Sequence, residues 1–391
     1  MNSRISSVDI FRALTMLLMI FVNDLWSLHD IPAWLEHTTA DEDGMGLADV
    51  VFPAFLFIVG LSIPLAIQAR IKKGESRSTI LLHIAKRALA LVMMGFFMVN
   101  FESFRQDIPK LYKDIWEVSM ALAIILIWNV YEKDKVLNAI PVWLMQGIGI
   151  GILVVLALVY KGGTAEDPQW MRPQWWGILG LIGWAYLLCS VIYLWSGQKI
   201  WIILVCLIIL HGLNVQEFIP LFKDKQSIRI IVSASMHALV MSGVLATLVY
   251  LKLKDKNRIE LFISILMLLA LVYIAYGFAT RPLWGISKIR ATPSWTTICA
   301  GIGFSCFALI YILADVLKIT RWSAIIMPAG RSTLTCYLLP YIIYPLFFPL
   351  IKLLPGSLTG GMAGIVKSLI FALAVILLTG LLERFRIKLK I

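Results

Sequence analysis

Apolar stretches long enough to cross a membrane recur along this chain from its first residues to its last. A helix of about 20 apolar residues spans the hydrocarbon core of a bilayer, which is about 30 Å thick. The expected spans lie near residues 8–28, 47–68, 80–101, 115–131, 136–160, 175–195, 200–214, 230–251, 260–279, 296–317, 324–351 and 362–382. The fourth and seventh are short or flanked by polar residues, so we expect 10–12 transmembrane helices.

Composition leads to the same fold class. Of the 391 residues, 60% are hydrophobic and only 15% are charged, and the mean hydropathy is +0.86. A soluble protein of this length needs more polar surface to cover its core. No repeat of 20–50 residues and no long linker divides the sequence. We therefore predict an all-α, polytopic integral membrane helical bundle that forms a single domain over residues 1–391.

The formal charge of +12 could indicate a nucleic-acid partner. In a membrane protein, however, Lys and Arg gather in cytoplasmic loops. Most of the 35 basic residues fall inside if the N-terminus is cytoplasmic, which predicts that both termini are cytoplasmic and that no nucleic acid is bound. The loop 280–295 is an exception, because it would carry Arg281, Lys288 and Arg290 on the outer side.

One loop that is predicted to lie outside contains residue types that are common in active sites. Residues 37–53 read HTTADEDGMGLADVVFP, with Gly44 and Gly46 permitting a tight chain reversal. Asp49 lies about one turn inside the next helix, so it should face the bundle and bond a partner. His37 is the kind of side chain that takes a proton near neutral pH. A lone loop histidine is nevertheless more often a solvated surface residue.

The first apolar helix also carries polar groups. Asp9 and Arg12 are three residues apart and therefore share one face. They form either a structural pair that fixes the helix at the interface or part of a site. Asn23 and Asp24 follow where the helix nears the outer surface, and both are also compatible with ordinary helix-end residues.

Common catalytic motifs are missing. The sequence has no HExxH, P-loop, GxSxG or EF-hand pattern, and its five cysteines lie in apolar segments without CxxC spacing. We therefore expect no metal site and no ATP-driven pump.

Several segments resemble the heparan-α-glucosaminide N-acetyltransferase family and its bacterial relatives, within the transmembrane acyltransferase superfamily. They are RISSVDIFRALTMLLMIFVND, the loop histidine, LADVVFPAFLFIVGLSIPLAI, ATPSW at 291–295 and MPAGRSTLTCYLL at 327–339. Two departures stand out: the histidine is followed by the long stretch TTADEDGMGLA, and the fourth stretch reads WEVSMALA where relatives carry Gly-Val-Leu-Gln-Arg.

The resemblance implies that an acetyl group passes from cytoplasmic acetyl-CoA to an amino sugar or another cell-envelope glycan on the far side of the membrane. It makes His37 the catalytic base, with Asn23 and Asp49 as catalytic partners and Asp9 and Arg12 in support. The candidates for the acyl-CoA phosphates are Lys86, Arg87, Lys133, Lys135 and Arg331. The candidates for acceptor binding are Trp26, Trp34, Arg281, Lys288 and Arg290, although belt tryptophans are the commoner interpretation of the first two.

An alternative hypothesis is a secondary transporter of a small polar solute, which the many helices and intramembrane polar residues would suit; no internal symmetry supports it. The expected location is a prokaryotic inner membrane, and the expected partners are the bilayer and a glycan acceptor. The sequence leaves open the acceptor's identity, a homodimer, acyl groups other than acetyl, and the choice between direct transfer and an acetyl-histidine intermediate.

Overall fold

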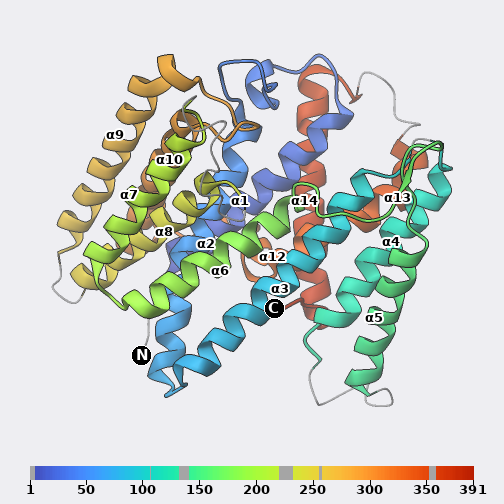
Figure 1. The fold of residues 1–391 in the computed structure, drawn as a ribbon, viewed down its shortest axis with the longest axis horizontal. Helices are drawn as coiled ribbons and strands as arrows, with labels where there is room; N and C mark the ends of the chain where they lie inside the picture. The colour runs from blue at the N-terminus through green and yellow to red at the C-terminus, as the bar shows by residue number, and fades with distance from the viewer. Residues whose placement is uncertain (1–4, 106, 132–140, 220–231, 255–257, 352–357) are drawn as a thin grey trace. The chain divides into compact units, whose positions relative to one another are not determined.

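The regular structure is almost entirely helical (Figure 1). The computed structural model describes residues 5–105, 107–131, 141–219, 232–254, 258–351 and 358–391. Within this part of the chain, seven helical segments are long and apolar enough to cross a membrane: α2 (Leu47–Lys72), α3 (Arg77–Glu102), α6 (Gly177–Ser196), α8 (Ala234–Leu253), α9 (Ile259–Trp284), the segment Pro293–Val316 and α14 (Gly361–Arg384). The predicted all-α polytopic membrane class is confirmed, whereas the cytoplasmic placement of the termini stays a prediction.

The remaining elements are shorter or more polar. The helices α1 (Ser6–Asp24) and α4 (Lys110–Trp128) are more polar, and α5 (Val142–Leu158) and α7 (Ile200–Gln216) are apolar but shorter. The segment Pro293–Val316 consists of α10 (Pro293–Tyr311) and a π-helical turn, η5 (Ile312–Val316). Single 3-10 turns lie at η1 (Leu25–Ser27), η2 (Ala33–Leu35) and η6 (Arg321–Ser323). The strands β1 (Gly162–Gly163) and β2 (Pro168–Gln169) form a small antiparallel hairpin, with Gly162 opposite Gln169.

The span expected at 324–351 is not one helix. It consists of α11 (Met327–Arg331), α12 (Thr333–Leu338) and α13 (Pro340–Ile351). Ser332 leaves the helical conformation with φ −125° and ψ 49°, and Pro340 has no N–H to donate to the preceding turn. The prediction of a continuous span here is therefore corrected to three consecutive helices.

The chain forms two compact units. Unit 1 comprises Met1–Thr15, Pro32–Leu89 and Leu181–Ala324, and unit 2 comprises Met16–Ile31, Ala90–Gly180 and Ile325–Ile391. Neither unit is a continuous segment, because the chain changes unit inside helices α1, α3 and α6. The single-domain organisation stays a prediction.

Helix α8 forms the centre of unit 1. Every residue from Ala234 to Val249 is buried, and α8 packs against α2, α7, α9 and α10 (Figure 1). The closest approach is between α8 and α2, where Gly60 and Gly243 bring the two backbones together: a Cβ at Gly60 would lie 1.9 Å from the carbonyl oxygen of Val240. Small residues allow this kind of tight helix contact in membranes. By contrast, α9 exposes large apolar side chains such as Leu271, as a lipid-facing helix does.

An aromatic cluster forms the core of unit 2. The indole of Trp116 on α4 lies against the rings of Phe101, Phe104 and Tyr160, with centroids 6.2, 5.2 and 6.2 Å away. Its Nε1–H donates to the carbonyl of Leu156 at 3.0 Å, so the buried indole has a polar partner. This cluster joins α3, α4 and α5.

The glycine contact between α2 and α8 gives a stability prediction. Gly60→Ala would drive a methyl group into the Val240 carbonyl, so we expect a loss of about 1–3 kcal/mol from overpacking and a lower melting temperature in detergent. Gly147→Ala is the control, because a Cβ there has no neighbour within 4 Å. Equal melting temperatures for the two variants would show that the close helix contact is not stabilising.

Candidate active site

A buried carboxylate organises the start of α2. Asp49 is the third residue of the helix and is fully buried. One oxygen, Oδ2, accepts from the N–H of Gly46 at 3.0 Å and from the N–H and hydroxyl of Thr38 at 3.0 and 2.9 Å. An acidic residue at this position that accepts from the N-cap backbone fixes the helix start. The acidic loop is thereby folded back onto the helix that follows it.

The other Asp49 oxygen holds the loop histidine. His37 Nδ1 lies 2.7 Å from Asp49 Oδ1, while 49% of the His37 side chain is exposed. Because a carboxylate can only accept, Nδ1 carries the proton that faces Asp49, and in the neutral ring Nε2 then has the lone pair. His37 and Asp49, which the resemblance makes catalytic partners, are therefore in contact, and their catalytic roles stay predictions.

A second loop is fastened over the acidic loop within unit 1. Asp43 accepts from Arg281 Nε at 2.9 Å and from the N–H of Ile286 at 2.6 Å, and Arg290 pairs with Asp41 at 2.5 Å. The hydrogen bond from Ile286 and the ion pair with Arg281 lower the pKa of Asp43. These contacts explain why basic residues occur in a loop that the sequence places outside.

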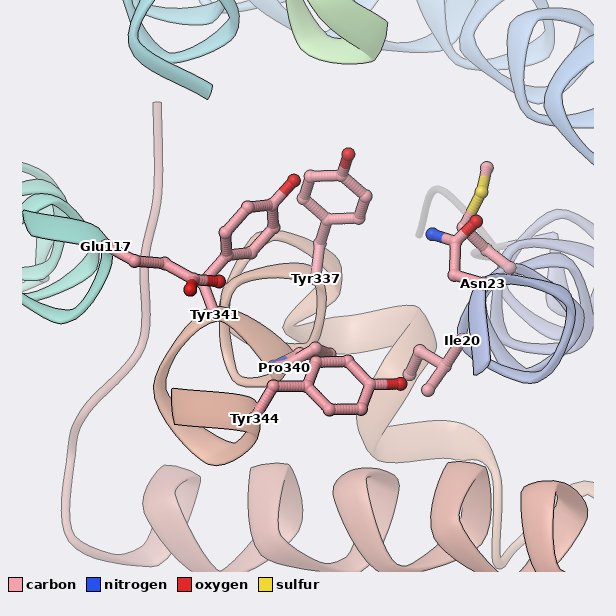
Figure 2. A pocket seen from close by; sticks show the side chains of 8 residues that line it. Ile20, Asn23, Glu117, Tyr337, Pro340, Tyr341 and Tyr344 are labelled. Atoms are coloured by element: carbon pink, nitrogen blue, oxygen red, sulfur yellow. The ribbon is translucent and has the colours of Figure 1, made fainter. Parts of the chain in front are cut away.

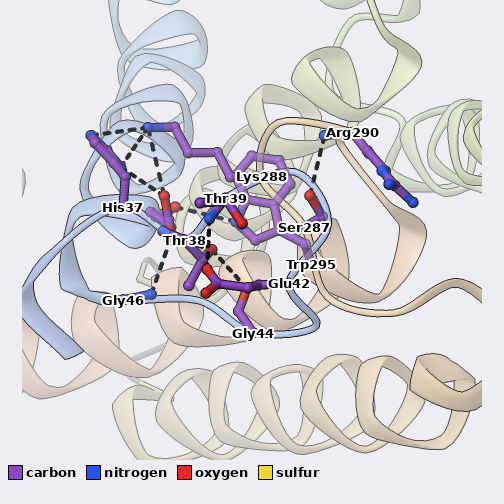
Figure 3. A network of polar contacts seen from close by, with 11 residues as sticks. His37, Thr38, Thr39, Glu42, Gly44, Gly46, Ser287, Lys288, Arg290 and Trp295 are labelled. Carbon is purple, nitrogen blue, oxygen red and sulfur yellow. Dashed lines mark hydrogen bonds and ion pairs between the residues drawn. The ribbon is translucent and has the colours of Figure 1, made fainter. Parts of the chain in front are cut away.

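Lys288 lies directly on the histidine (Figure 3). Its Nζ is 3.1 Å from Nδ1 and 3.5 Å from Nε2 of His37, and 3.8 Å from Asp49 Oδ1. Since Nδ1–H already points at Asp49, the ammonium can donate only to Nε2 of the ring. The sequence assigned Lys288 to acceptor binding and missed this contact, because 251 residues separate the two side chains.

The segment ATPSW supports the same site from α10. The Thr292 hydroxyl caps the helix by accepting from the N–H of Trp295, and Trp295 Nε1 donates to the Asp49 carbonyl at 3.2 Å. Trp295 is fully buried. The segment therefore has a structural role, which is to hold the backbone of Asp49.

Asn23 lies in unit 2 at the end of α1 and is exposed. Its neighbour Asp24 fixes this helix end: Asp24 accepts from the hydroxyls of Tyr344 and Ser368, both at 2.6 Å, and Lys367 Nζ is 3.3 Å away. The Asn23 side chain lines a cavity of about 120 Å³ in the same unit. Its catalytic role stays a prediction.

The pair formed by Asp9 and Arg12 on α1 lies within unit 1. Arg12 donates to Asp9 Oδ1 at 3.2 Å and to the Ser62 hydroxyl on α2 at 2.7 Å. Asp9 is buried and Arg12 is partly buried. The pair thus ties α1 to α2, and its supporting role in the site stays a prediction.

The remaining candidates are dispersed. Lys86 and Arg87 are exposed on α3, and Arg87 lies 5.0 Å from the ring centroid of Tyr186. Arg331 pairs with Glu383 at 3.2 Å. Exposed tryptophans lie in both units, Trp34 in unit 1 and Trp26 in unit 2. Two candidates, Lys133 and Lys135, lie outside the described residues. The acyl-CoA and acceptor roles of all these residues, and the expected lack of a metal, stay predictions.

Fold and site together define a polytopic helical membrane protein with a histidine–aspartate pair at the head of a membrane-spanning helix. Residues 4–107 match the family model described as heparan-alpha-glucosaminide N-acetyltransferase, catalytic. The human heparan-alpha-glucosaminide N-acetyltransferase is 37% identical over 101 residues, and the mouse protein of that name is 34% identical over 102. Each match covers 25% of this chain and 14% of the relative. The resemblance to the heparan-α-glucosaminide N-acetyltransferase family that the sequence indicated is therefore confirmed for residues 4–107.

The tight loop gives a prediction for the site. A Cβ at Gly46 would lie 2.0 Å from the carbonyl oxygen of Glu36, the residue before His37. Gly46→Ala should therefore displace the His37 segment and lower the melting temperature by several degrees, because backbone cannot move aside as a flexible side chain does. Gly44→Ala is the matched control, with its nearest contact at an ordinary 3.8 Å. A Gly46→Ala protein as stable as the Gly44→Ala protein would contradict this loop packing.

Proposed function

We propose that this chain is a membrane acetyltransferase that passes an acetyl group from acetyl-CoA to the amine of an amino sugar or another cell-envelope glycan. The observation that carries the proposal is the His37–Asp49 pair, which lies inside the segment that matches an acetyltransferase catalytic domain. Acetyl-CoA would bind from the cytoplasmic side, and the acceptor would approach from the opposite side. A hydroxyl acceptor would use the same chemistry.

His37 would act as the general base. Its Nε2 lone pair takes a proton from the acceptor nitrogen as that nitrogen bonds to the thioester carbonyl carbon. The carbon–sulfur bond then breaks, and the imidazolium returns the proton to the departing thiolate, so that an amide and free CoA thiol are formed. The Asp49 carboxylate holds the Nδ1–H tautomer and offsets the positive charge that the ring gains. Asn23 would orient the acetyl group or donate to the developing oxyanion.

Lys288 would be a positioning residue for this base. Its ammonium contacts both ring nitrogens and lies near Asp49, so it restrains the ring in the orientation that Asp49 sets. This restraint on the ring depends on whether the Lys288 amine is charged.

Thiol release from acetyl-CoA by the detergent-purified protein, with glucosamine and related amino sugars as acceptors, tests the proposal. We expect acceptor-dependent release by the wild type and a loss of about 10²–10⁴-fold in His37→Ala, which is the usual contribution of a general base. His83→Ala is the control, because it removes an imidazole that is 47% exposed, close to the 49% of His37.

A wild-type protein that neither binds nor consumes acetyl-CoA would reject the acetyltransferase and favour the alternative hypothesis of a transporter, which has no use for a thioester. Equal loss of activity in the His37 and His83 variants would reject His37 as the base. Wild-type turnover with a hydroxyl acceptor alone would redirect the proposal to O-acetylation.

The pH profile of turnover tests Lys288. Burial lowers the pKa of the Lys288 amine, against the opposing effects of the Asp49 carboxylate and the Cys299 thiol. The charged fraction therefore falls as pH rises through a value below the ordinary lysine pKa, and with it the restraint on His37. We expect Lys288→Met to lower kcat about tenfold with little change in KM. Lys288→Arg should keep activity and move the alkaline limb to higher pH, because a guanidinium stays charged. An alkaline limb unchanged in Lys288→Arg would remove Lys288 from this role.

A further inference from the structure

Basic and apolar residues alternate strictly at the end of α14 and beyond it. Residues 384–391, called the basic segment below, read RFRIKLKI and contain no carboxylate. Because α14 is long and apolar enough to cross a membrane, a segment that begins at its last residue should lie at the level of the lipid headgroups. Side chains alternate between the two faces of an extended chain, so the pattern predicts one apolar face and one basic face.

The apolar face of the basic segment is packed against unit 2. Leu389 is 5% exposed, and its N–H donates to the hydroxyl of Thr335 on α12 at 3.0 Å. The N–H of Lys390 donates to the carbonyl of Trp128, the last residue of α4, also at 3.0 Å. Leu389 therefore points inward, and the side chains of its neighbours Lys388 and Lys390 point away from the protein.

Arg386 has a backbone conformation that is unfavourable for an arginine. Its φ is 63°, in the left-handed region that favours glycine. The N–H of Arg386 donates to the carbonyl of Glu383 at 3.1 Å, and the N–H of Ile387 donates to the carbonyl of Leu382 at 2.9 Å. This pair of hydrogen bonds commonly ends a helix with glycine in the left-handed position. An arginine in place of that glycine indicates that its side chain has a use beyond the turn.

The cations around this turn outnumber the carboxylates. Arg331 and Lys388 both lie 3.2 Å from the carboxylate of Glu383, which therefore faces two cations. Arg384 and Lys390 are exposed, and neither forms an ion pair within the part of the chain that the structure describes. One carboxylate cannot balance these four cations, so the surface keeps a net positive charge.

We propose that the basic segment binds the phosphate headgroups of anionic phospholipids. Arg384, Arg386 and Lys390 supply the positive charge, and a guanidinium group can bind phosphate through two parallel hydrogen bonds. Phe385, which is 70% exposed between the two arginines, offers an apolar ring to the acyl chains. A lipid suits this surface better than a soluble anion does, because the charges begin at the end of a membrane-spanning helix and adjoin exposed apolar surface.

The basic segment contacts unit 2 away from the cavity that Figure 2 shows. Thr335 and Tyr337 are two residues apart on α12, so their side chains point to nearly opposite sides of the helix. Thr335 bonds the basic segment, whereas Tyr337 lines the cavity together with Asn23 and Glu117. On α4, Glu117 precedes Trp128 by roughly 16 Å of helix. Substitutions on the basic face should therefore leave the lining of the cavity unchanged.

The melting temperature of the detergent-purified protein, measured with phosphatidylglycerol or phosphatidylcholine added in equal amounts, tests the proposal. We expect phosphatidylglycerol to raise the wild-type melting temperature by several degrees more than phosphatidylcholine does, because a ligand that binds the folded state stabilises it. Salt at about 1 M, which shortens the screening length to about 3 Å, should remove most of the difference. The triple variant Arg384→Gln, Arg386→Gln, Lys390→Gln should lose most of the phosphatidylglycerol effect.

Two controls keep the test decisive. The triple variant Lys72→Gln, Lys73→Gln, Arg77→Gln loses the same charge at the turn between α2 and α3 in unit 1, and it should keep the phosphatidylglycerol effect. Arg386→Gly covers the case in which the first triple variant folds poorly. Glycine suits a φ of 63°, so this variant should melt no lower than the wild type without lipid and still show a smaller phosphatidylglycerol effect.

Equal effects of the two lipids on the wild type would overturn the proposal. Equal losses in the two triple variants would also overturn it, because the basic residues would then serve only the general preference for positive charge at membrane ends. If inorganic phosphate at matched ionic strength stabilises the wild type as much as phosphatidylglycerol does, the surface is a site for a soluble anion and the lipid proposal falls. Acetyl-CoA is absent throughout, so the outcome is independent of the proposed function.

Discussion

The polar contacts around the start of α2 in unit 1 depend on the Asp49 carboxylate. Its two oxygens accept hydrogen bonds from different groups. Oδ2 holds the loop against the N-terminus of α2 through Thr38 and Gly46, and Oδ1 orients His37. A carboxylate in the first turn of a helix is stabilised by the free N–H groups and the helix dipole. Burial that would be costly for an isolated charge is offset here by four close donors. One residue thus starts a membrane-spanning helix and sets the tautomer of the proposed base.

The ion pairs in unit 1 between the loop after His37 and the segment before α10 follow from charge balance. The loop after His37 is rich in carboxylates, whereas the last turn of α9 and the loop before α10 together carry three cations. Arg281 and Arg290 meet Asp43 and Asp41, while Lys288 reaches His37 and Asp49. Exposed pairs of this kind contribute little to stability one at a time. Their effect is positional, because they hold the Lys288 backbone where its side chain reaches the imidazole.

Hydropathy predicted the positions of the helices well, since burial in lipid constrains apolar length more strongly than any local propensity does. It could not predict that the span at 324–351 is broken at Ser332, because that break depends on backbone angles rather than on hydropathy. The resemblance named His37 and Asp49 as catalytic residues, and their contact is seen only in the structure. Lys288 was predicted to bind the acceptor, and its contact with His37 was missed because it joins residues far apart in sequence. Glu117 lay in the segment WEVSMALA, which departs from the family pattern, but hydropathy gave it no role.

The buried carboxylates differ in how they are compensated, and this difference separates structure from binding. Asp24 is nearly inaccessible, with Tyr344, Ser368 and Lys367 around it. Asp49 is inaccessible and also surrounded by donors. Both therefore act within the folded chain, one holding the end of α1 and the other holding His37. Glu117 is similarly buried but borders open space in place of donors.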